Sequence, residues 1–482
     1  MGEFKQKVAK SFFWVAIDGV GQSLLQFVIG IILARILLPE EFGTVGVIAI
    51  FIALSMVFVN SGFGFALIRK KHVSEADYHT VFWFNIFVSV LFFAILWFTS
   101  PLIADFYNEA ILSDVVKVVS VNLLINAASS IQNVKLTRNF KFRQLTVIGI
   151  ISKIISGSLA IYMAFSGFGL WSLVYKELIG NITRMILLWV GGKFLPKFIF
   201  SKNSFRELFS FSSKLLYSGV SSTVLRNIYP VLIGKFFSLS EVGYFNRAEG
   251  LKNMSIHLLT GMIQKVTLPM FSEIQDDQEA FKRNYTKVIQ LTVLLSGYPL
   301  VLLFVTGEPL TEFVYTAKWL PMVPMLKILV IGGIFYPLNA LNYNMIGVKG
   351  RSDIVMNLSF SNQALTLVSI GVGIIWGLMG LVVAYSIKSV ISYLLVVYFT
   401  NKVINYPFME QFNDIKRIGL VIIFTAGIGS IVMPVFHGTV LKLIAAFFIC
   451  SLTYVITTLL FRIDVSKEAH SILKELFRKG LK

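Results

Sequence analysis

Cysteine is almost absent from this sequence, with Cys450 alone among 482 residues. A single thiol excludes disulfides within the chain and cysteine-based metal sites. The five histidines are scattered and form no cluster with metal-ligand spacing. Charged residues are also scarce, at 14% of the chain, whereas a soluble domain has about a quarter. The composition is therefore not that of a soluble or disulfide-stabilised protein.

Motifs for enzyme chemistry are lacking as well. The pattern G-x-x-x-x-G-K-[ST], which binds nucleotide phosphates, does not occur, so ATP-driven pumping by this chain is not expected. No arrangement of serine, histidine and aspartate for nucleophilic catalysis can be assembled. We therefore expect a protein that is not an enzyme and that needs no metal or organic cofactor.

Long apolar runs, in contrast, are abundant. Hydrophobic residues make up 56% of the chain, and the mean hydropathy is +0.76. Apolar stretches of about 20 residues, the length of a membrane-crossing helix, recur along nearly the whole sequence. We therefore predict an all-α polytopic membrane protein with about 14 transmembrane helices, at roughly 11–38, 42–67, 78–103, 114–134, 145–166, 168–191, 208–236, 241–268, 284–305, 321–346, 354–376, 378–401, 416–436 and 438–461.

Basic residues alternate between the two sets of predicted loops. Of the 43 lysines and arginines, 28 fall in one set together with the tail, and five fall in the other. The positive-inside rule makes the first set cytoplasmic and places both termini inside. The formal net charge of +18 then reflects membrane topology, and nucleic acid is not an expected partner. The tail from Arg462 is predicted to be a short amphipathic cytoplasmic helix.

An internal repeat organises the chain. A shift of 200 residues places IILARILLPEEFG over VLIGKFFSLSEVG, so that Gly43 falls on Gly243. Six predicted helices separate the two copies, and an even number gives both copies the same orientation in the membrane. The predicted domains are an N-terminal six-helix lobe, a cytoplasmic linker, a C-terminal six-helix lobe, two additional helices and a cytoplasmic tail, at 1–191, 192–207, 208–401, 402–461 and 462–482.

The remaining ten basic residues lie within the predicted helices, and six of these stand out inside segments that otherwise have the composition of membrane spans. A lysine or arginine at the centre of a spanning helix costs ~2.5–3.5 kcal/mol. We therefore expect these side chains to face a water-filled cavity that binds an anionic substrate. The six are Lys153, Lys176, Arg226, Arg247, Lys252 and Lys388.

Depth divides these six residues into two groups. Arg226, Lys252 and Lys388 lie ~15 Å from a helix end, near the bilayer midplane. The other three lie closer to a helix end, where a long side chain can reach the interface. We predict that the deep group points into the space between the lobes. The alternative is structural pairing, as Lys252 can make with Glu249 one turn away.

Acidic residues within the predicted spans are candidates for coupling transport to a proton or a sodium ion. They are Asp18, Glu177 and Glu249. Glu177 adjoins Lys176 and Glu249 can pair with Lys252, whereas Asp18 has no basic residue nearby in the sequence. The predicted cavity is therefore lopsided, with most of its anion-binding residues in the C-terminal lobe and Asp18 in the other.

Prolines inside predicted spans mark bending points, because each removes a backbone hydrogen bond. They are Pro230, Pro299 and Pro337. Alternating access requires such points, although static packing is an equally good explanation of them.

Together these features resemble the Wzx-type polysaccharide flippases of the multidrug/oligosaccharidyl-lipid/polysaccharide exporter superfamily. The resemblance rests on the two lobes, the basic cavity, the turn ARILLPEEFG (Ala34 to Gly43) and the segment NSGFGFALIRKK (Asn60 to Lys71). It covers essentially the whole chain, and it is closest to the branch serving lipopolysaccharide, colanic-acid-like and teichuronic-acid-like polymers. It implies a MATE-like fold.

The resemblance also implies a function. The protein would turn an undecaprenyl-pyrophosphate-linked oligosaccharide from the inner to the outer leaflet of the bacterial cytoplasmic membrane by alternating access. Its expected partners are this lipid-linked oligosaccharide and membrane lipid, with the polysaccharide polymerase and chain-length machinery as further candidates, and it is expected to act as a monomer. Asp18 corresponds, by helix, to a first-helix aspartate of related drug exporters. Residues 416–461 resemble two helices that help lipid II flippases to form a groove for the polyprenyl tail.

Three alternatives differ from this hypothesis in testable ways. A lipid II flippase of the same fold is disfavoured because Asp18 lacks the neighbouring first-helix arginine of that group. A multidrug exporter of the same fold needs an acidic or aromatic pocket for cationic drugs, and the predicted cavity has the opposite charge. A membrane glycosyl polymerase or ligase would need a sizeable outer loop, and the predicted outer loops are short.

Overall fold

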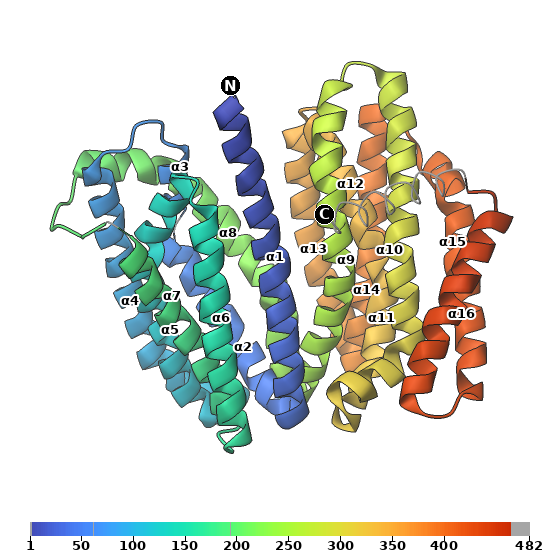
Figure 1. Ribbon diagram of the computed structural model, residues 1–482, viewed down its shortest axis with the longest axis horizontal. Helices are drawn as coiled ribbons and strands as arrows, with labels where there is room; N and C mark the ends of the chain where they lie inside the picture. The colour runs from blue at the N-terminus through green and yellow to red at the C-terminus, as the bar shows by residue number, and fades with distance from the viewer. Residues whose placement is uncertain (1, 61, 193, 464–482) are drawn as a thin grey trace. The chain divides into compact units, whose positions relative to one another are not determined.

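The computed structural model describes residues 2–60, 62–192 and 194–463, and every element assigned within these ranges is helical (Figure 1). The contacts between residues divide the chain into two compact units, 1–243 and 244–482. The predicted amphipathic tail helix lies almost entirely outside the described residues. The predicted lobe and linker boundaries stay a prediction, because they follow the sequence repeat and not the contacts.

The first unit contains eight helices and the beginning of a ninth. Their bounds are α1 Gly2–Ile36, α2 Pro39–Asn60, α3 Phe63–Arg69, α4 Glu75–Tyr107, α5 Ile111–Arg138, α6 Phe142–Phe165, α7 Leu170–Gly191, α8 Lys202–Phe236 and the first turn of α9 Leu239–Glu273. Within this unit α1 packs on α6, α6 and α5 pack on α7, α4 packs on α5, and α2 packs on α8.

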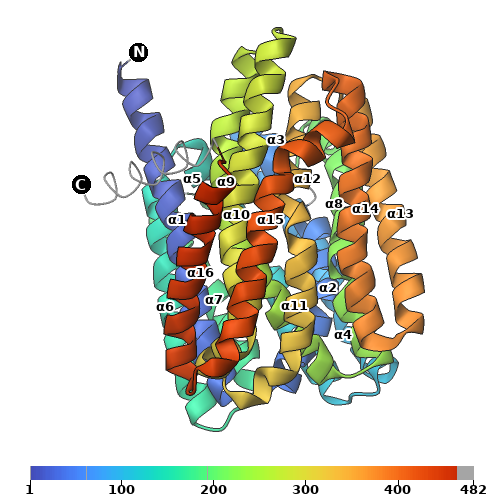
Figure 2. The same cartoon turned by 90° about the vertical axis from the view of Figure 1, so that its right-hand side faces the viewer.

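The second unit contains the rest of α9 and seven further α-helices. Their bounds are α10 Gln278–Tyr315, α11 Val323–Gly333, α12 Phe335–Val348, α13 Ser352–Ile375, α14 Gly377–Ile404, α15 Phe408–Val432 and α16 Thr439–Leu460, with short 3₁₀ helices at Ala317–Met322 and Met433–Val435. α13 packs on α14, and α10 packs against both α15 and α16 (Figure 2). The core of this unit includes the fully buried rings of Phe271, Phe281, Tyr285 and Tyr406.

Within the described residues, eleven segments are long and apolar enough to cross a membrane. The three remaining long helices are α7, α8 and α9, and each carries lysine, arginine and glutamate residues within its length. The two groups together are consistent with the fourteen spans expected. The all-α class is confirmed, and the chain is a multi-pass membrane protein.

Two predicted helices are interrupted. The predicted span 42–67 is divided between α2 and α3, and Gly62 before α3 has a left-handed φ of +71°, which glycine adopts without steric strain. The predicted span 321–346 is divided between α11 and α12. Pro337 lacks the N–H that the carbonyl of Gly333 would otherwise accept, which explains the end of α11 at that residue. α8 and α10 continue through Pro230 and Pro299.

The turns between α1 and α2 and between α8 and α9, which the repeat superposes, lie against each other within the first unit. A Cβ atom on Gly43 would lie 1.7 Å from the carbonyl oxygen of Leu239. A Cβ atom on Gly243 would lie 2.0 Å from the carbonyl oxygen of Pro39. Each glycine therefore admits the backbone of the other turn, and the contact is reciprocal.

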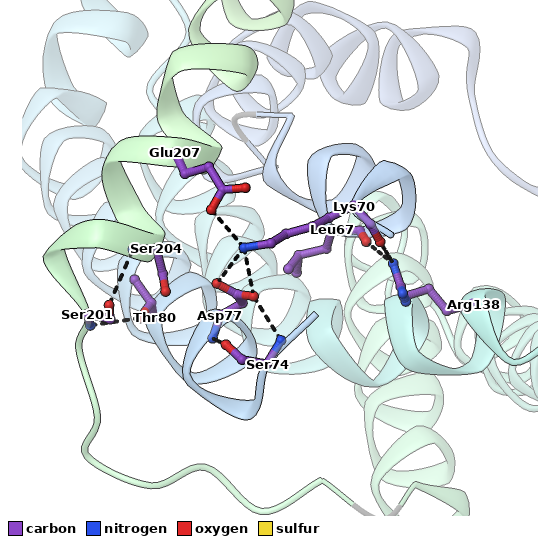
Figure 3. Close-up of polar contacts among 9 residues, drawn as sticks. All are labelled: Leu67, Lys70, Ser74, Asp77, Thr80, Arg138, Ser201, Ser204 and Glu207. Atoms are coloured by element: carbon purple, nitrogen blue, oxygen red, sulfur yellow. Dashed lines mark hydrogen bonds and ion pairs between the residues drawn. The ribbon is translucent and has the colours of Figure 1, made fainter. Parts of the chain in front are cut away.

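A polar cluster fastens the α3–α4 turn of the first unit to the beginning of α8 (Figure 3). The Lys70 ammonium donates to Glu207 at 2.8 Å and to Asp77 at 3.2 Å. Asp77 also accepts from the backbone N–H of Ser74 at 2.9 Å, which completes a capping box at the start of α4. Burial alone would lower the pKa of Lys70, but the hydrogen bonds to Glu207 and Asp77 raise this pKa above its ordinary value.

The segment that leads into α8 is fastened to α4 and α5 through its backbone. Gln132 donates to the carbonyl of Phe194, and Trp83 donates to the carbonyl of Lys197, each at 2.8 Å. The N–H of Ser201 donates to Thr80 at 2.9 Å. The described part of the predicted linker is therefore held against the first unit over several residues.

Candidate functional site

A polar cavity of about 200 Å³ lies inside the first unit, between α1, α6 and α7. Its lining includes three cations and one carboxylate: Lys153, Lys176, Arg184 and Glu177. The remaining lining residues are mostly small or uncharged polar ones: Gln22, Gln26, Ile29, Gly149, Ser152, Ser156, Gly180 and Asn181. The cavity therefore has a net positive charge and many uncharged hydrogen-bonding groups.

The helical repeat explains why these residues meet. On α7, Glu177, Asn181 and Arg184 are spaced by four and three residues, so they share one face of the helix. On α1, Gln22 and Gln26 are four residues apart and form a second polar stripe. Because α6 packs on both α1 and α7, the two stripes face a common space beside α6.

Hydrogen bonds hold the cations at the wall of the cavity. The Lys153 ammonium on α6 donates to the carbonyl of Gln22 at 3.3 Å and to the side-chain oxygen of Gln26 at 3.2 Å. Arg184 donates to the side chain of Asn133 on α5 at 3.4 Å. These acceptors of Lys153 and Arg184 are uncharged oxygens, so the hydrogen bonds leave both positive charges available to an anionic ligand.

The acidic residues of this region have different environments. Glu177 lies 3.2 Å from the Lys176 ammonium, and its side chain is 56% exposed. Asp18, one turn before Gln22 on α1, accepts a hydrogen bond of 2.6 Å from the Gln22 amide. Asp18 is therefore connected to the cavity wall through Gln22, although it does not itself line the cavity.

Glycine keeps the cavity open. A Cβ atom on Gly149 would lie 2.4 Å from the amide nitrogen of Gln22. A Cβ atom on Gly180 would lie 3.1 Å from the hydroxyl of Ser156. Larger residues at these two positions would push polar side chains of the wall from their present places.

A second charged cluster lies within the second unit and joins α9 to α14. The Tyr385 hydroxyl donates to Glu249 at 2.8 Å, and the Lys252 ammonium lies 3.9 Å from the same carboxylate. Lys252 is buried, with 5% of its surface exposed, and its ammonium lies 5.0 Å from the centre of the Tyr385 ring. Lys388, one turn further along α14, lies 5.9 Å from that ring. Both lysines therefore lie near the Tyr385 ring, and Lys252 also pairs with Glu249.

The structure distributes the predicted site residues as follows. Three of them belong to the cavity of the first unit: Lys153, Lys176 and Glu177. Three form the cluster of the second unit: Glu249, Lys252 and Lys388. Arg226 has an exposed side chain on α8. The Arg247 guanidinium lies 5.8 Å from the ring centres of Tyr315 and Trp319. The predicted orientation of the deep residues toward a space between the lobes stays a prediction.

The sequence patterns did not identify three residues of these clusters: Arg184, Asn181 and Tyr385. Arg184 was not among the six basic residues singled out within the predicted spans, although it lies inside one of them. The signal that could have found it is the spacing of Glu177, Asn181 and Arg184 on one face of a single span. Tyr385 gives no comparable signal, because its role depends on contact with α9.

The arrangement suits reversible binding of an anion. Among the residues that the structure describes, no group of three or more histidine, cysteine, aspartate or glutamate side chains could hold a metal ion. What the cavity offers is cationic and amide hydrogen-bond donors, which bind phosphate and hydroxyl oxygens.

Comparison with known sequences gives two kinds of match. Residues 32–324 match the family described as "Polysaccharide biosynthesis protein". The chain is 24% identical over 442 residues to the teichuronic acid biosynthesis protein TuaB of Bacillus subtilis (strain 168), covering 91% of each chain. It is 21% identical over 407 residues to the lipopolysaccharide biosynthesis protein WzxC of Escherichia coli (strain K12), covering 82% of this chain and 81% of that one.

Solved structures share the fold. The lipid II flippase MurJ in its inward closed conformation superposes with a TM-score of 0.74 at 16% identity, covering 93% of this chain and 99% of that chain. An inward-facing multidrug resistance MATE family transporter of the MOP superfamily gives 0.62 at 14% identity, covering 82% and 98%. At such identities the likeness shows the fold alone. The predicted MATE-like fold is confirmed, as is the resemblance to polysaccharide flippases.

Proposed function

Because the chain belongs to the polysaccharide biosynthesis protein family, we propose that it moves an anionic, lipid-linked oligosaccharide across the membrane. The observation that carries this proposal is the cavity between α1, α6 and α7. Its three cations outnumber its one carboxylate, and it lies within a multi-pass membrane protein. A diphosphate or another multiply charged anion matches that balance.

The size of the cavity sharpens the proposal. Its volume of about 200 Å³ is below the ~300–1,000 Å³ of sites that enclose a whole small molecule. The cavity would therefore hold the charged head of the substrate or one sugar, and not the whole oligosaccharide. The uncharged donors Gln22, Gln26 and Asn181 suit sugar hydroxyls, whereas Lys153 and Arg184 suit the phosphates.

The finer features belong to the same proposal. The substrate is an undecaprenyl-pyrophosphate-linked repeat unit, and transfer runs from the inner to the outer leaflet of the bacterial cytoplasmic membrane by alternating access. The basic loops and both termini are cytoplasmic, as their lysine and arginine content favours. Asp18, hydrogen-bonded to the cavity wall through Gln22, is the candidate for coupling to a proton or a sodium ion.

An exporter of cationic drugs is the competing function on the same fold. The excess of lysine and arginine in the cavity of the first unit disfavours it, because a cationic ligand would be repelled there. The family match and the fold are those of membrane polysaccharide-biosynthesis proteins and transporters. We therefore place it among transporters and not among polymerases or ligases.

The test is complementation of a strain from which the gene has been deleted. The deletion strain should accumulate lipid-linked oligosaccharide on the inner leaflet, and the parent protein should clear it. Variants Lys153→Ala and Arg184→Ala should restore transport poorly at equal protein levels. The control Lys117→Ala removes a lysine on α5 that pairs with Asp114 outside the cavity, and it should restore transport fully. Normal transport by both cavity variants would contradict the proposal.

A further inference from the structure

A mainly apolar groove lies between α13 and α14 in the second unit. Its volume is about 320 Å³. The apolar residues along it are well exposed, including Val368 at 60%, Ile387 at 52% and Trp376 at 71%. Of the described residues that line the groove, Lys388 alone is charged. The groove therefore presents a long apolar surface with one cation in its wall.

Lys388 connects this groove to the buried cluster on α9. Its side chain lines the groove, and its ammonium lies 5.9 Å from the Tyr385 ring. On the same ring lies the Lys252 ammonium, and the Tyr385 hydroxyl donates to Glu249. The cluster has two ammonium groups and one carboxylate, so its net charge is positive. An apolar surface and a positive cluster thus meet at one side chain.

The depth of Lys388 makes ordinary membrane lipid a poor match for this combination. Lys388 follows Gly377, the first residue of α14, by eleven positions, which is ~17 Å along a helix. The hydrocarbon core is ~30 Å thick, so Lys388 lies close to its middle. Phospholipid tails can cover the groove, but their phosphates stay at the bilayer surface and cannot reach this cation. A ligand that fits both the apolar groove and the positive cluster must carry an anionic head to the middle of the membrane.

We propose that the groove between α13 and α14 holds the apolar chain of the lipid-linked substrate while the phosphates of its head contact Lys388 and Lys252 in transit. This inference rests on the proposed function and adds a binding element for the lipid part of the same substrate. The ligand is an amphiphile with a long hydrocarbon chain and a diphosphate head. Binding replaces part of the interaction of Lys252 with Glu249 by an interaction with phosphate.

The experiment uses the purified full-length protein in lipid nanodiscs and a polyprenyl diphosphate that carries a photoreactive diazirine on its chain. A phosphatidylglycerol with the same diazirine serves as the bulk-lipid probe. We expect the prenyl probe to label residues 365–391, and Lys388→Met to reduce this labelling at least fivefold. Lys388→Arg, which keeps the charge, should retain most of it.

A second variant tests the apolar part of the groove. Val372→Trp places a large side chain within the groove and should reduce labelling by the prenyl probe several-fold. Leu367→Trp is the matched control, because Leu367 is 59% exposed on the same helix but does not line the groove. Labelling should be unchanged in this control. Both variants should retain the parent's elution profile in size-exclusion chromatography.

Two outcomes would overturn the inference. One is equal labelling of residues 365–391 by both probes without dependence on Lys388, which identifies ordinary lipid as the occupant. The other is labelling by the prenyl probe concentrated on α15 and α16, the pair that the family resemblance predicts for the tail. Failure of the proposed function looks different, because the deletion strain would then accumulate no lipid-linked oligosaccharide whatever the groove variants do.

Discussion

The two charged clusters contain similar residues in different surroundings. In the first unit, Lys176 and Glu177 form a pair with side chains that are 24% and 56% exposed, beside an open cavity. In the second unit, the side chains of Lys252 and Glu249 are 7% and 27% exposed, beneath the Tyr385 ring. An exposed cluster exchanges water for a ligand at little cost, whereas a buried one is held by its own partners. The first cluster suits initial binding, and the second suits a role that also supports the fold.

The largest expected effect is on the buried pair. Lys252→Met should lower the free energy of unfolding by about 2 kcal/mol, because Glu249 loses its paired ammonium in a poorly solvated place. Fully buried pairs lose ~3–5 kcal/mol, and the partial exposure of Glu249 reduces this figure. Chemical unfolding in detergent measures the change.

The control for Lys252→Met is the double variant Lys252→Met with Glu249→Gln, which removes both charges of the pair. It should recover at least half of the lost stability, because apolar or neutral replacements of a buried pair are often well tolerated. If Lys252→Met has the same free energy of unfolding as the parent, the buried cluster does not stabilise the fold and does not differ from the exposed one in this respect.

The open cavity should show the reverse pattern. Arg184→Ala should reduce transport about tenfold, as expected for loss of one charge-assisted hydrogen bond of ~1.5 kcal/mol to the substrate. The free energy of unfolding should change by less than ~0.5 kcal/mol, because Arg184 is exposed. Transport assays and unfolding of the same purified variant give both numbers. A large loss of stability with unchanged transport would assign Arg184 to the fold.

Filling the cavity should give a smaller effect. The new methyl group of Gly149→Ala displaces the Gln22 amide and disturbs its hydrogen bond to Asp18, so transport should fall roughly threefold. Helix propensity favours alanine by ~0.5–1 kcal/mol, which offsets the strain in the free energy of unfolding. Gly19→Ala is the control, because a Cβ atom there meets nothing within 4 Å, and its transport should be unchanged.

The smallest effect is expected for the Lys70 cluster, whose residues belong to neither of the two charged clusters. The pKa of Lys70 is raised in the folded protein, so its contribution is fully present below the ordinary value of 10.5 and is lost as the pH rises through the higher folded value. Lys70→Met should therefore lower stability by less than about 1 kcal/mol at pH 7–9. The difference from the parent should disappear only above pH 10.5, as the pH rises through the folded pKa of Lys70, and unfolding at a series of pH values would show this.

Much of the fold follows from local sequence patterns. Apolar runs and the 200-residue repeat predicted the helices and their all-α class, because both are encoded within single segments. The helix breaks at Gly62 and before Pro337 were not predicted. The segment that forms α2 and α3 has the composition of a single apolar span. The left-handed φ of Gly62 can be recognised only from the backbone of the folded chain.

The sites were less predictable than the fold, because they depend on which helices touch. Sequence spacing identified Lys153, Lys176 and Glu177 as anomalies, but their common cavity requires α6 to pack between α1 and α7. Similarly, the possible pairing of Lys252 with Glu249 follows from helical spacing. The participation of Tyr385, 136 residues away from Glu249 in the sequence, follows from tertiary structure alone.

The reciprocal contact of Gly43 and Gly243 has a consequence for how the chain is assembled. In a two-fold symmetric dimer the interface is isologous: if residue i of one subunit contacts residue j of the other, then residue j of the first contacts residue i of the second. Here the two equivalent positions of each pair, Pro39 and Leu239 or Gly43 and Gly243, belong to one polypeptide. The joint is made of carbonyl oxygens against Cα atoms, so it imposes a requirement on two positions and leaves the surrounding side chains free to diverge.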